Sequence, residues 1–290
     1  MAHETLSLGS EVKREGQPQA SQHLPLGSRT LIMGIVNVTP DSFSDGGQFL
    51  KPDKALAQAR RIEAEGADII DVGAESTRPG AVEITAEEEL ARLVPVLQPL
   101  VQATSLPISV DTYKAAVARE ALRLGASMVN DVGGLQRDPE MAAVVAEYQV
   151  PVVIMHNQED TVYESDLMEA LSCFFEKSLQ IAHSAGVLKS NIILDPGIGF
   201  GKTFEHNIEV LRRLKELESL GYPLLLGVSR KSVIGHILDL PPQERLEGTL
   251  AAHVLGIQQG VAVLRVHDVA AHRRAVRVAD KLLRPEGSLE

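Results

Sequence analysis

The chain has 290 residues, of which 44% are hydrophobic and 23% charged, and its formal net charge is -11 at pH 7. This acidity argues against a broad nucleic-acid surface, which needs a basic stripe. No apolar run approaches the ~18 residues of a membrane helix. The single cysteine, Cys173, allows no internal disulfide and fits the reducing cytoplasm. Because it lies in the apolar face of a predicted helix, we expect a buried thiol.

Eight apolar, β-branched runs recur along the chain, and a segment with helical periodicity follows each of them. The predicted strands are Leu31–Val36, Asp68–Val72, Pro107–Val110, Ser127–Val129, Val152–Met155, Asn191–Leu194, Leu224–Val228 and Val261–Val266. Eight β-α units in this order predict a single-domain (β/α)8 TIM barrel of the α/β class. In that fold the chemistry lies at the carboxyl ends of the strands.

The predicted helices are Asp53–Glu65, Ala86–Ala103, Lys114–Leu124, Pro139–Tyr148, Ser165–Ala185, Glu205–Leu220, Gln243–Gln259 and Val269–Leu283. Asp53 and Thr203 are expected N-caps, and the expected C-cap glycines are Gly66, Gly125, Gly186, Gly221 and Gly260. Residues 1–28 are polar, lack periodicity and contain no secretory-signal core, which predicts a flexible leader. The barrel is therefore expected over residues 29–285, with a disordered tail at 286–290.

Nearly every predicted strand ends on a polar or ionisable residue. These residues are Asn37, Asp71, Asp111, Asn130, His156, Asp195, Ser229 with Lys231, and Arg265 with His267. For His156, a site role and a hydrogen-bonded core role are equally open. Two long loops after strands, residues 37–47 and 73–84, are rich in Gly, Pro, Asp and Ser and are typical of functional lids.

The residues at these strand ends form two sets of candidate binding residues. Period-two alternation places Arg265 and His267 on one side of the last strand, next to the hydroxyl- and cation-rich turn 229–232. This predicts an anion site, as barrels often bind phosphate after strands seven and eight. Asp111, Asn130 and Asp195 suit a ligand with an array of N–H donors, because a buried carboxylate needs a partner. A metal site with Asp and Asn ligands is the alternative.

The segment 195–203 (DPGIGFGKT) resembles a phosphate-binding P-loop but fails its spacing. The pattern needs glycine five residues before Gly-Lys-Thr, where this chain has Pro196. Gly197, Gly199 and Gly201 also miss the dinucleotide spacing G-x-G-x-x-G. We therefore interpret the glycines as allowing close backbone approach to a flat ligand, with Phe200 offered as a contact surface.

Seven blocks carry a resemblance that runs in order over about residues 30–285. They are residues 33–47 (MGIVNVTPDSFSDGG), 71–80 (DVGAESTRPG), 109–112 (SVDT), 130–132 (NDV), 195–202 (DPGIGFGK), 229–232 (SRKS) and 265–269 (RVHDV). Together they resemble the motifs of the dihydropteroate synthase family. That family condenses 6-hydroxymethyl-7,8-dihydropterin diphosphate with p-aminobenzoate, giving 7,8-dihydropteroate and pyrophosphate in folate biosynthesis.

The resemblance implies roles for individual residues. The pterin ring would be held by Asp111, Asn130, Asp195 and Lys231, and the diphosphate by Asn37, Arg265 and His267, with Asn37 also a ligand of Mg2+. The p-aminobenzoate pocket would be bordered by Thr77, Arg78, Pro79, Phe200, Lys231 and Ser232, with Phe43 on the first loop. Asp195, Lys231, Asp111 and Arg265 would be the catalytic residues. A homodimer and competitive inhibition by sulfonamides are also implied.

Two alternatives remain open at this point. One is another pterin-binding barrel, such as a methyltetrahydrofolate methyltransferase, which needs no pyrophosphate site. The other is a catalytically silent paralogue. In addition, the acidic turn Asn157–Asp160 after Met155-His156 departs from the family pattern, so the contacts of that loop are left open.

Overall fold

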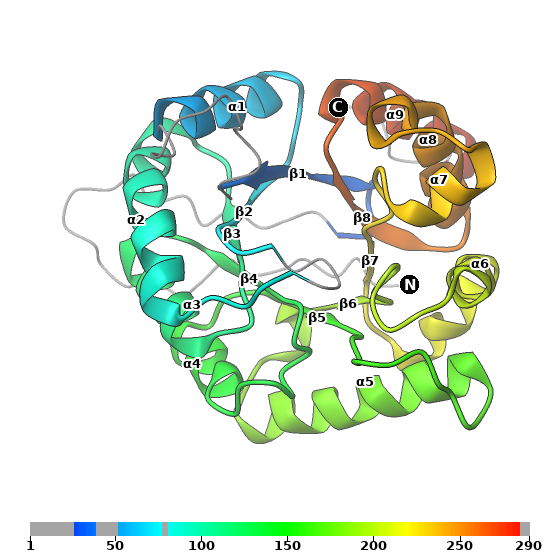
Figure 1. Cartoon of the computed structure of the whole chain (residues 1–290), viewed down its shortest axis with the longest axis horizontal. Helices are drawn as coiled ribbons and strands as arrows, with labels where there is room; N and C mark the ends of the chain where they lie inside the picture. Colours follow the sequence, from blue (N-terminus) through cyan, green and yellow to red (C-terminus); the bar gives the residue numbers. More distant parts are fainter. Residues whose placement is uncertain (1–25, 39–51, 77–80, 285–290) are drawn as a thin grey trace.

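The computed structural model describes residues 26–38, 52–76 and 81–284. Parallel strands close into a barrel in the order β1-β2-β3-β4-β5-β6-β7-β8, and β8 pairs with β1. Helices form a ring around this barrel (Figure 1). The strands are β1 (Leu31–Asn37), β2 (Ile69–Gly73), β3 (Ile108–Asp111), β4 (Met128–Asp131), β5 (Val152–Met155), β6 (Ile192–Asp195), β7 (Leu224–Leu226) and β8 (Val261–Val266). The predicted (β/α)8 barrel is confirmed.

The helices of the described residues follow the expected alternation. They are α1 (Pro52–Ala64), α2 (Ala86–Ala103), α3 (Ala115–Leu124), α4 (Met141–Tyr148), α5 (Leu167–Ser184), α6 (Phe204–Arg213), α7 (Ser232–Leu238), α8 (Leu246–Gln258) and α9 (Val269–Leu283), with short 3-10 turns η2 (Lys189–Asn191), η3 (Leu214–Leu220) and η4 (Pro242–Glu244). The helix predicted over 205–220 is α6 followed by η3. The sequence prediction missed α7, which has 7 residues and contains Gly235, too few for a clear helical period.

The predicted caps are mostly confirmed. The Thr203 hydroxyl accepts a hydrogen bond from the His206 backbone N–H and caps α6. All the predicted C-cap glycines have positive φ. Asp53 is not an N-cap, because α1 begins at Pro52 and Asp53 lies inside its first turn. There its carboxylate still meets the positive end of the helix dipole.

The barrel interior changes from apolar to polar along the strand direction. Met33, Ile69 and Val153 belong to a buried cluster of inward-facing strand residues. β2, β4, β6 and β8 each contribute at least one residue to this apolar cluster. Two residues beyond one such residue on each of these strands, the alternation of the strand places a polar side chain inside the barrel. These are Asp71, Asn130, Asp195 and Arg265. The polar layer therefore lies at the carboxyl ends of the strands, on top of a closed apolar floor.

Cys173 is exposed, so the prediction of a buried thiol is wrong. On α5, Leu171, Phe175 and Leu179 are buried, which defines the inward stripe at a spacing of four residues. Cys173 lies two residues from Leu171, roughly 200° around the helix. It therefore faces solvent.

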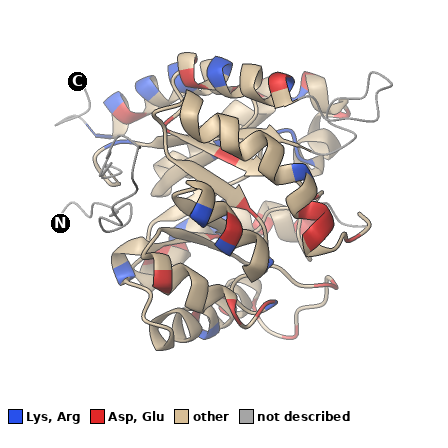
Figure 2. Ribbon diagram, turned by 90° about the vertical axis from the view of Figure 1, so that its left-hand side faces the viewer, with Lys and Arg blue, Asp and Glu red and all other residues tan. Residues whose placement is uncertain are grey.

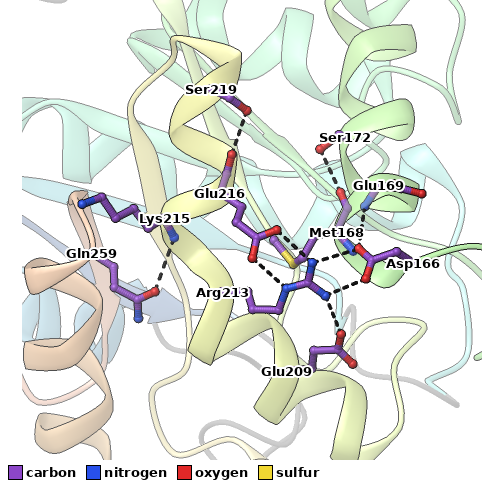
Figure 3. Close-up of polar contacts among 10 residues, drawn as sticks. All are labelled: Asp166, Met168, Glu169, Ser172, Glu209, Arg213, Lys215, Glu216, Ser219 and Gln259. Carbon is purple, nitrogen blue, oxygen red and sulfur yellow. Dashed lines mark hydrogen bonds and ion pairs between the residues drawn. The ribbon is translucent and has the colours of Figure 1, made fainter.

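An ion-pair cluster ties the outer helices on one side of the barrel. The Arg213 guanidinium at the end of α6 contacts the carboxylates of Asp166, Glu209 and Glu216, each at 2.7 Å (Figure 3). Asp166 also caps α5 by accepting from the backbone of Met168 and Glu169. One side chain thus links the start of α5 to the junction of α6 and η3.

The chain ends and the outer surface complete the fold. Leu26, which the sequence analysis placed in the leader, is buried in the apolar floor. Residues 1–25 and 285–290 lie outside the described ranges. Acidic and basic residues are interspersed over the helices on the face shown in Figure 2. In the described ranges, no helix has the length and apolarity needed to cross a bilayer.

Candidate active site

A half-buried guanidinium lies between two buried carboxylates at the centre of the polar layer. Arg265 Nε donates to Asp71 Oδ2 and Arg265 Nη2 donates to Asp111 Oδ2, both at 2.6 Å. Asn130 Nδ2 donates to the same Asp71 oxygen at 3.3 Å. The other oxygen of each carboxylate, Oδ1, is buried and accepts no hydrogen bond from the described residues. The cluster therefore holds unused acceptors that a ligand with N–H donors can satisfy.

Burial raises the pKa values of two site carboxylates, Asp111 and Asp195. The pKa of Asp111 is raised to about 7, because loss of solvent disfavours its charged form more than the neighbouring Arg265 favours it. Burial also raises the pKa of Asp195. Near neutral pH the site therefore gains from a ligand that supplies donors to both carboxylates.

Asp195 and Lys231 face one another across a backbone cradle at Gly227. The Gly197 N–H donates to Asp195 Oδ1 at 2.8 Å. A Cβ on Gly227 would lie 3.7 Å from Asp195 Oδ2 and 3.9 Å from Lys231 Nζ. Any side chain at position 227 would enter the space between these groups, so glycine keeps that space open.

Lys231 connects this cradle to the loop that follows β6. Its ammonium donates to the Ile198 carbonyl at 2.5 Å and lies 4.7 Å from the centroid of the Phe200 ring. Burial lowers the pKa of Lys231 to about 8, against the attraction of Asp195. Phe200 and Lys231, which the family resemblance assigns to one pocket, are thus in contact.

The β6–α6 loop is held by a second lysine that the sequence analysis did not single out. The buried ammonium of Lys202 donates to the carbonyls of Gly197 and Phe200, each at 3.0 Å, and lies 2.8 Å from His156 Nδ1. Burial lowers its pKa to about 7. Gly197 has a φ of +67°, and a Cβ there would lie 1.9 Å from the His156 carbonyl oxygen. Lys202 therefore acts inside the loop, which supports rejecting the P-loop interpretation.

His156 is a buried neutral histidine beneath this loop. Burial lowers its pKa to about 3, and its ring packs 4.7 Å from the centroid of Phe174. These contacts favour the core role among the two that the sequence left open. The Asn157 amide after it donates to the Val132 carbonyl at 3.1 Å, and Asp160 is exposed. The unusual acidic turn is thus anchored by Asn157.

The residues of the predicted anion site (229–232, Arg265 and His267) do not all contact one another: Ser229 contacts His267, whereas Arg265 contacts two carboxylates. The Ser229 hydroxyl accepts from the His267 backbone N–H at 3.2 Å and lies 3.0 Å from His267 Nδ1. Ser232 begins α7 and is exposed. His267 follows the last residue of β8, and the Nε and Nη2 of Arg265 face the two carboxylates. In the described residues, no hydrogen bond is made by its Nη1.

A charged network fixes the neck of the second long loop. Glu75 accepts from the Ile84 backbone N–H at 3.0 Å, which joins the two ends of that loop. Lys114 then bridges Glu75 at 2.5 Å and the buried Glu89 at 2.7 Å. A groove of about 590 Å³ lies beside this neck, with Tyr113 and Phe200 in its wall. Thr77, Arg78, Pro79 and Phe43 lie outside the described residues.

Asn37 is the candidate metal ligand at the end of β1. It is half-buried and pairs in register with Gly73 of β2. Within residues 26–38, 52–76 and 81–284, no cluster of three or more His, Cys, Asp or Glu side chains could hold a metal ion. One amide oxygen fits a Mg2+ ion that takes its other ligands from substrate phosphates and water. The described protein side chains by themselves do not form a complete coordination shell for a metal ion.

Asp71 contacts Arg265 in the site, but the sequence analysis assigns no role to it. It was noted as a strand end but given no role, although a carboxylate inside an otherwise apolar strand signals an obligatory partner. Here that partner is Arg265, far away in the sequence. Lys202 carried a weaker signal, since a lysine after a glycine-rich turn is most often solvated.

Comparisons with known proteins agree with this geometry. A family model described as "Pterin binding enzyme" matches residues 33–267. The dihydropteroate synthase of Bacillus subtilis (strain 168) is 51% identical over 259 residues, covering 89% of this chain and 90% of its own.

Two solved structures are similar over nearly their whole length. A Clostridium difficile dihydropteroate synthase in the presence of pteroic acid has a TM-score of 0.88 and 56% identity, covering 90% of this chain and 99% of its own. A Xanthomonas albilineans dihydropteroate synthase with 4-aminobenzoic acid has a TM-score of 0.89 and 42% identity, covering 98% and 99%. The barrel, its polar layer and these similarities together show that the chain belongs to the dihydropteroate synthase family of pterin-binding enzymes.

Proposed function

We propose that this chain condenses 6-hydroxymethyl-7,8-dihydropterin diphosphate with p-aminobenzoate, forming 7,8-dihydropteroate and releasing pyrophosphate with Mg2+ as cofactor. The observation that carries the proposal is the pair of buried oxygens on Asp71 and Asp111 that accept no hydrogen bond from the described residues. A pterin presents guanidine-like N–H donors on a flat ring, which is the complement of such acceptors. The similarity to a dihydropteroate synthase structure determined in the presence of pteroic acid supports pterin binding by this chain.

In this proposal the pterin ring lies in the polar layer, above the apolar floor. Asp111 and Asp195 accept its ring N–H groups, Asn130 adds an amide, and Lys231 donates to a ring oxygen or nitrogen. The space over Gly227, which Asp195 Oδ2 and Lys231 Nζ both face, takes one edge of the ring. Removing these charges from water makes each hydrogen bond to the ligand stronger than it would be in solvent.

The diphosphate then lies toward β1 and β8, where Asn37, Arg265 and His267 can reach it. Arg265 already balances two carboxylates, and its Nη1 is the group that we assign to the anion. Asn37 would hold Mg2+ together with phosphate oxygens. When bound, the ion would neutralise charge on the diphosphate.

The reaction begins with cleavage of the C–O bond between the pterin methylene carbon and the diphosphate, and the bonding electron pair leaves on the phosphate oxygen. Arg265 and His267 stabilise that developing negative charge. Asp195 and Asp111 stabilise the cation that remains on the pterin. The amine lone pair of p-aminobenzoate then forms the C–N bond, and the amine loses a proton to solvent or pyrophosphate. The two long loops would exclude water, which otherwise captures the cation.

The p-aminobenzoate pocket is assigned to the face where Phe200 and Lys231 meet. Phe200 offers a ring for stacking, and Lys231 and Ser232 lie next to each other at the start of α7. Thr77, Arg78, Pro79 and Phe43 would close the pocket from the two loops. The Xanthomonas albilineans structure with 4-aminobenzoic acid supports such a pocket in this family. Sulfonamides, which also carry an aniline opposite an acidic group, would compete there.

An omission assay tests the function. Pyrophosphate release is measured with the dihydropterin diphosphate, Mg2+ and p-aminobenzoate, each left out in turn. We expect release and dihydropteroate formation only with all three components. Tight pterin binding without turnover would instead identify a silent paralogue, and methyl transfer from methyltetrahydrofolate would identify the methyltransferase alternative.

Replacing Asp195 tests its catalytic role. Asp195→Asn keeps the shape of the side chain but removes the charge that faces the pterin cation, so we expect kcat to fall roughly 100-fold or more. Asp160→Asn, on an exposed turn nearby, is the matched control and should retain wild-type turnover. Wild-type kcat in a folded Asp195→Asn protein would contradict the assignment.

The affinity for a pterin analogue should fall both at acidic and at alkaline pH, with a maximum between. Below about pH 7, Asp111 becomes protonated and loses its ability to accept a ring N–H, so affinity falls as the pH decreases. Above about pH 8, Lys231 loses its proton and affinity falls as the pH increases. Isothermal titration should therefore find the tightest binding between these values. Lys231→Met should remove the alkaline limb and keep the acidic one; a profile unchanged by this substitution would refute the role of Lys231.

We further propose that the protein acts as a homodimer in the cytoplasm. Large apolar side chains are exposed on neighbouring outer helices: Ile237 of α7 is 56% and Leu255 of α8 is 58% exposed. Such a patch is typical of a protein interface. Leu255→Glu should halve the mass measured by sedimentation equilibrium, whereas Val162→Glu, an exposed apolar residue on a distant loop, should not. A monomeric wild type would disprove the dimer.

A further inference from the structure

Arg230 holds a backbone conformation that its side chain disfavours. Its φ is +60°, in the left-handed region that glycine adopts freely and other residues rarely do. Arg230 stands between Ser229, which contacts His267, and Lys231, which reaches Ile198 and Phe200. A strained residue persists only where its surroundings hold it in place. The turn between two proposed site residues therefore depends on the contacts around it.

Contacts from three residues, in α8 and in the turn between β8 and α9, hold this turn. Asp268, after β8, accepts from Arg230 Nε at 2.9 Å and from Nη2 at 2.5 Å, a two-pronged ion pair. The buried Thr249 hydroxyl of α8 accepts from the Arg230 backbone N–H at 3.2 Å. Arg245 Nη1, at the start of α8, donates to the carbonyls of Arg230 at 2.9 Å and Lys231 at 3.3 Å. Both peptide groups around the strained residue are thus fixed.

The direction of the Arg230 side chain matters as much as its conformation. The Arg230 guanidinium forms an ion pair with Asp268, and both side chains are only partly exposed. Arg230 is therefore not one of the cations that we assign to diphosphate binding. Asp268 directly follows His267 in the chain. The ion pair therefore runs alongside the Ser229–His267 contact and joins the same two loops a second time.

We propose that the Arg230–Asp268 ion pair is a positioning device for the reaction. It holds the left-handed turn that aims Lys231 at the pterin space and keeps Ser229 against His267. If Arg230 relaxed to an ordinary φ, the following peptide would rotate and carry the Lys231 side chain away from Asp195 and Phe200. Arg230 and Asp268 touch no substrate in this scheme, which rests on the proposed function.

The test is a double-mutant comparison of kcat/KM and of pterin-analogue affinity. Asp268→Asn should reduce kcat/KM by ~10–100-fold, because a small misplacement of a substrate-holding group has costs of this order. Arg230→Gly should lose less, since glycine adopts the turn without the ion pair. The double variant Arg230→Gly/Asp268→Asn should be no worse than Arg230→Gly alone. Glu147→Gln, which breaks the exposed Arg119–Glu147 pair, is the control and should change nothing.

Two outcomes would overturn the proposal. An equal loss from Asp268→Asn in the wild-type protein and in the Arg230→Gly variant would mean that Asp268 does not act through the turn. A loss from Arg230→Gly as large as that from Asp268→Asn would mean that the Arg230 side chain itself is needed. Circular dichroism and thermal unfolding confirm that each variant folds. Because affinity for the pterin analogue is read separately, failure of the synthase reaction in the wild type stays distinguishable from failure of the ion-pair mechanism.

Discussion

The contact of the half-buried Arg265 with the buried Asp71 and Asp111 is the constraint on which the rest of the site depends. Two carboxylates in a closed barrel are stable only beside a cation, and a guanidinium can serve both with separate N–H groups. The three residues come from β2, β3 and β8, so the contact can form only after the barrel closes. The arrangement leaves one oxygen on each carboxylate without a partner among the described residues. That unmet acceptor capacity is a cost to the free protein and a source of affinity for a ligand rich in N–H groups.

Around this centre, the loops are held by charges that do not themselves need to react. Lys202 fixes the carbonyls of the β6–α6 loop from below, and Lys231 fixes the same loop from the side of the cradle. Lys114 fixes the neck of the second loop through Glu75. The bond from Lys202 to the Phe200 carbonyl fixes the backbone that carries the Phe200 ring. In the proposed reaction, such preorganisation would favour formation of the pterin cation, because the dipoles are already aligned when the charge appears.

Burial also makes the charges of Asp111 and Lys231 sensitive to what occupies the site. Asp111 and Lys231 have pKa values moved toward neutrality by loss of solvent, so both are sensitive to what occupies the site. A bound pterin would satisfy Asp111 with donors and Lys231 with an acceptor, which favours the charged form of each. In the proposed complex, substrate binding would therefore be coupled to ionisation of Asp111 and Lys231.

The sequence by itself determined the barrel, because eight apolar runs separated by helical periods admit few other arrangements. It also determined which residues lie at the active face, since that face is where strands end. It could not assign Asp71 and Arg265 to one another, or show that Lys202 turns into its own loop, because these contacts join positions distant in the chain or depend on burial. It mistook Cys173 for a core residue, because a helix segment read without its neighbours does not show which stripe faces inward. The left-handed turn at Arg230 was likewise invisible, since only contacts from α8 and the β8–α9 turn impose it.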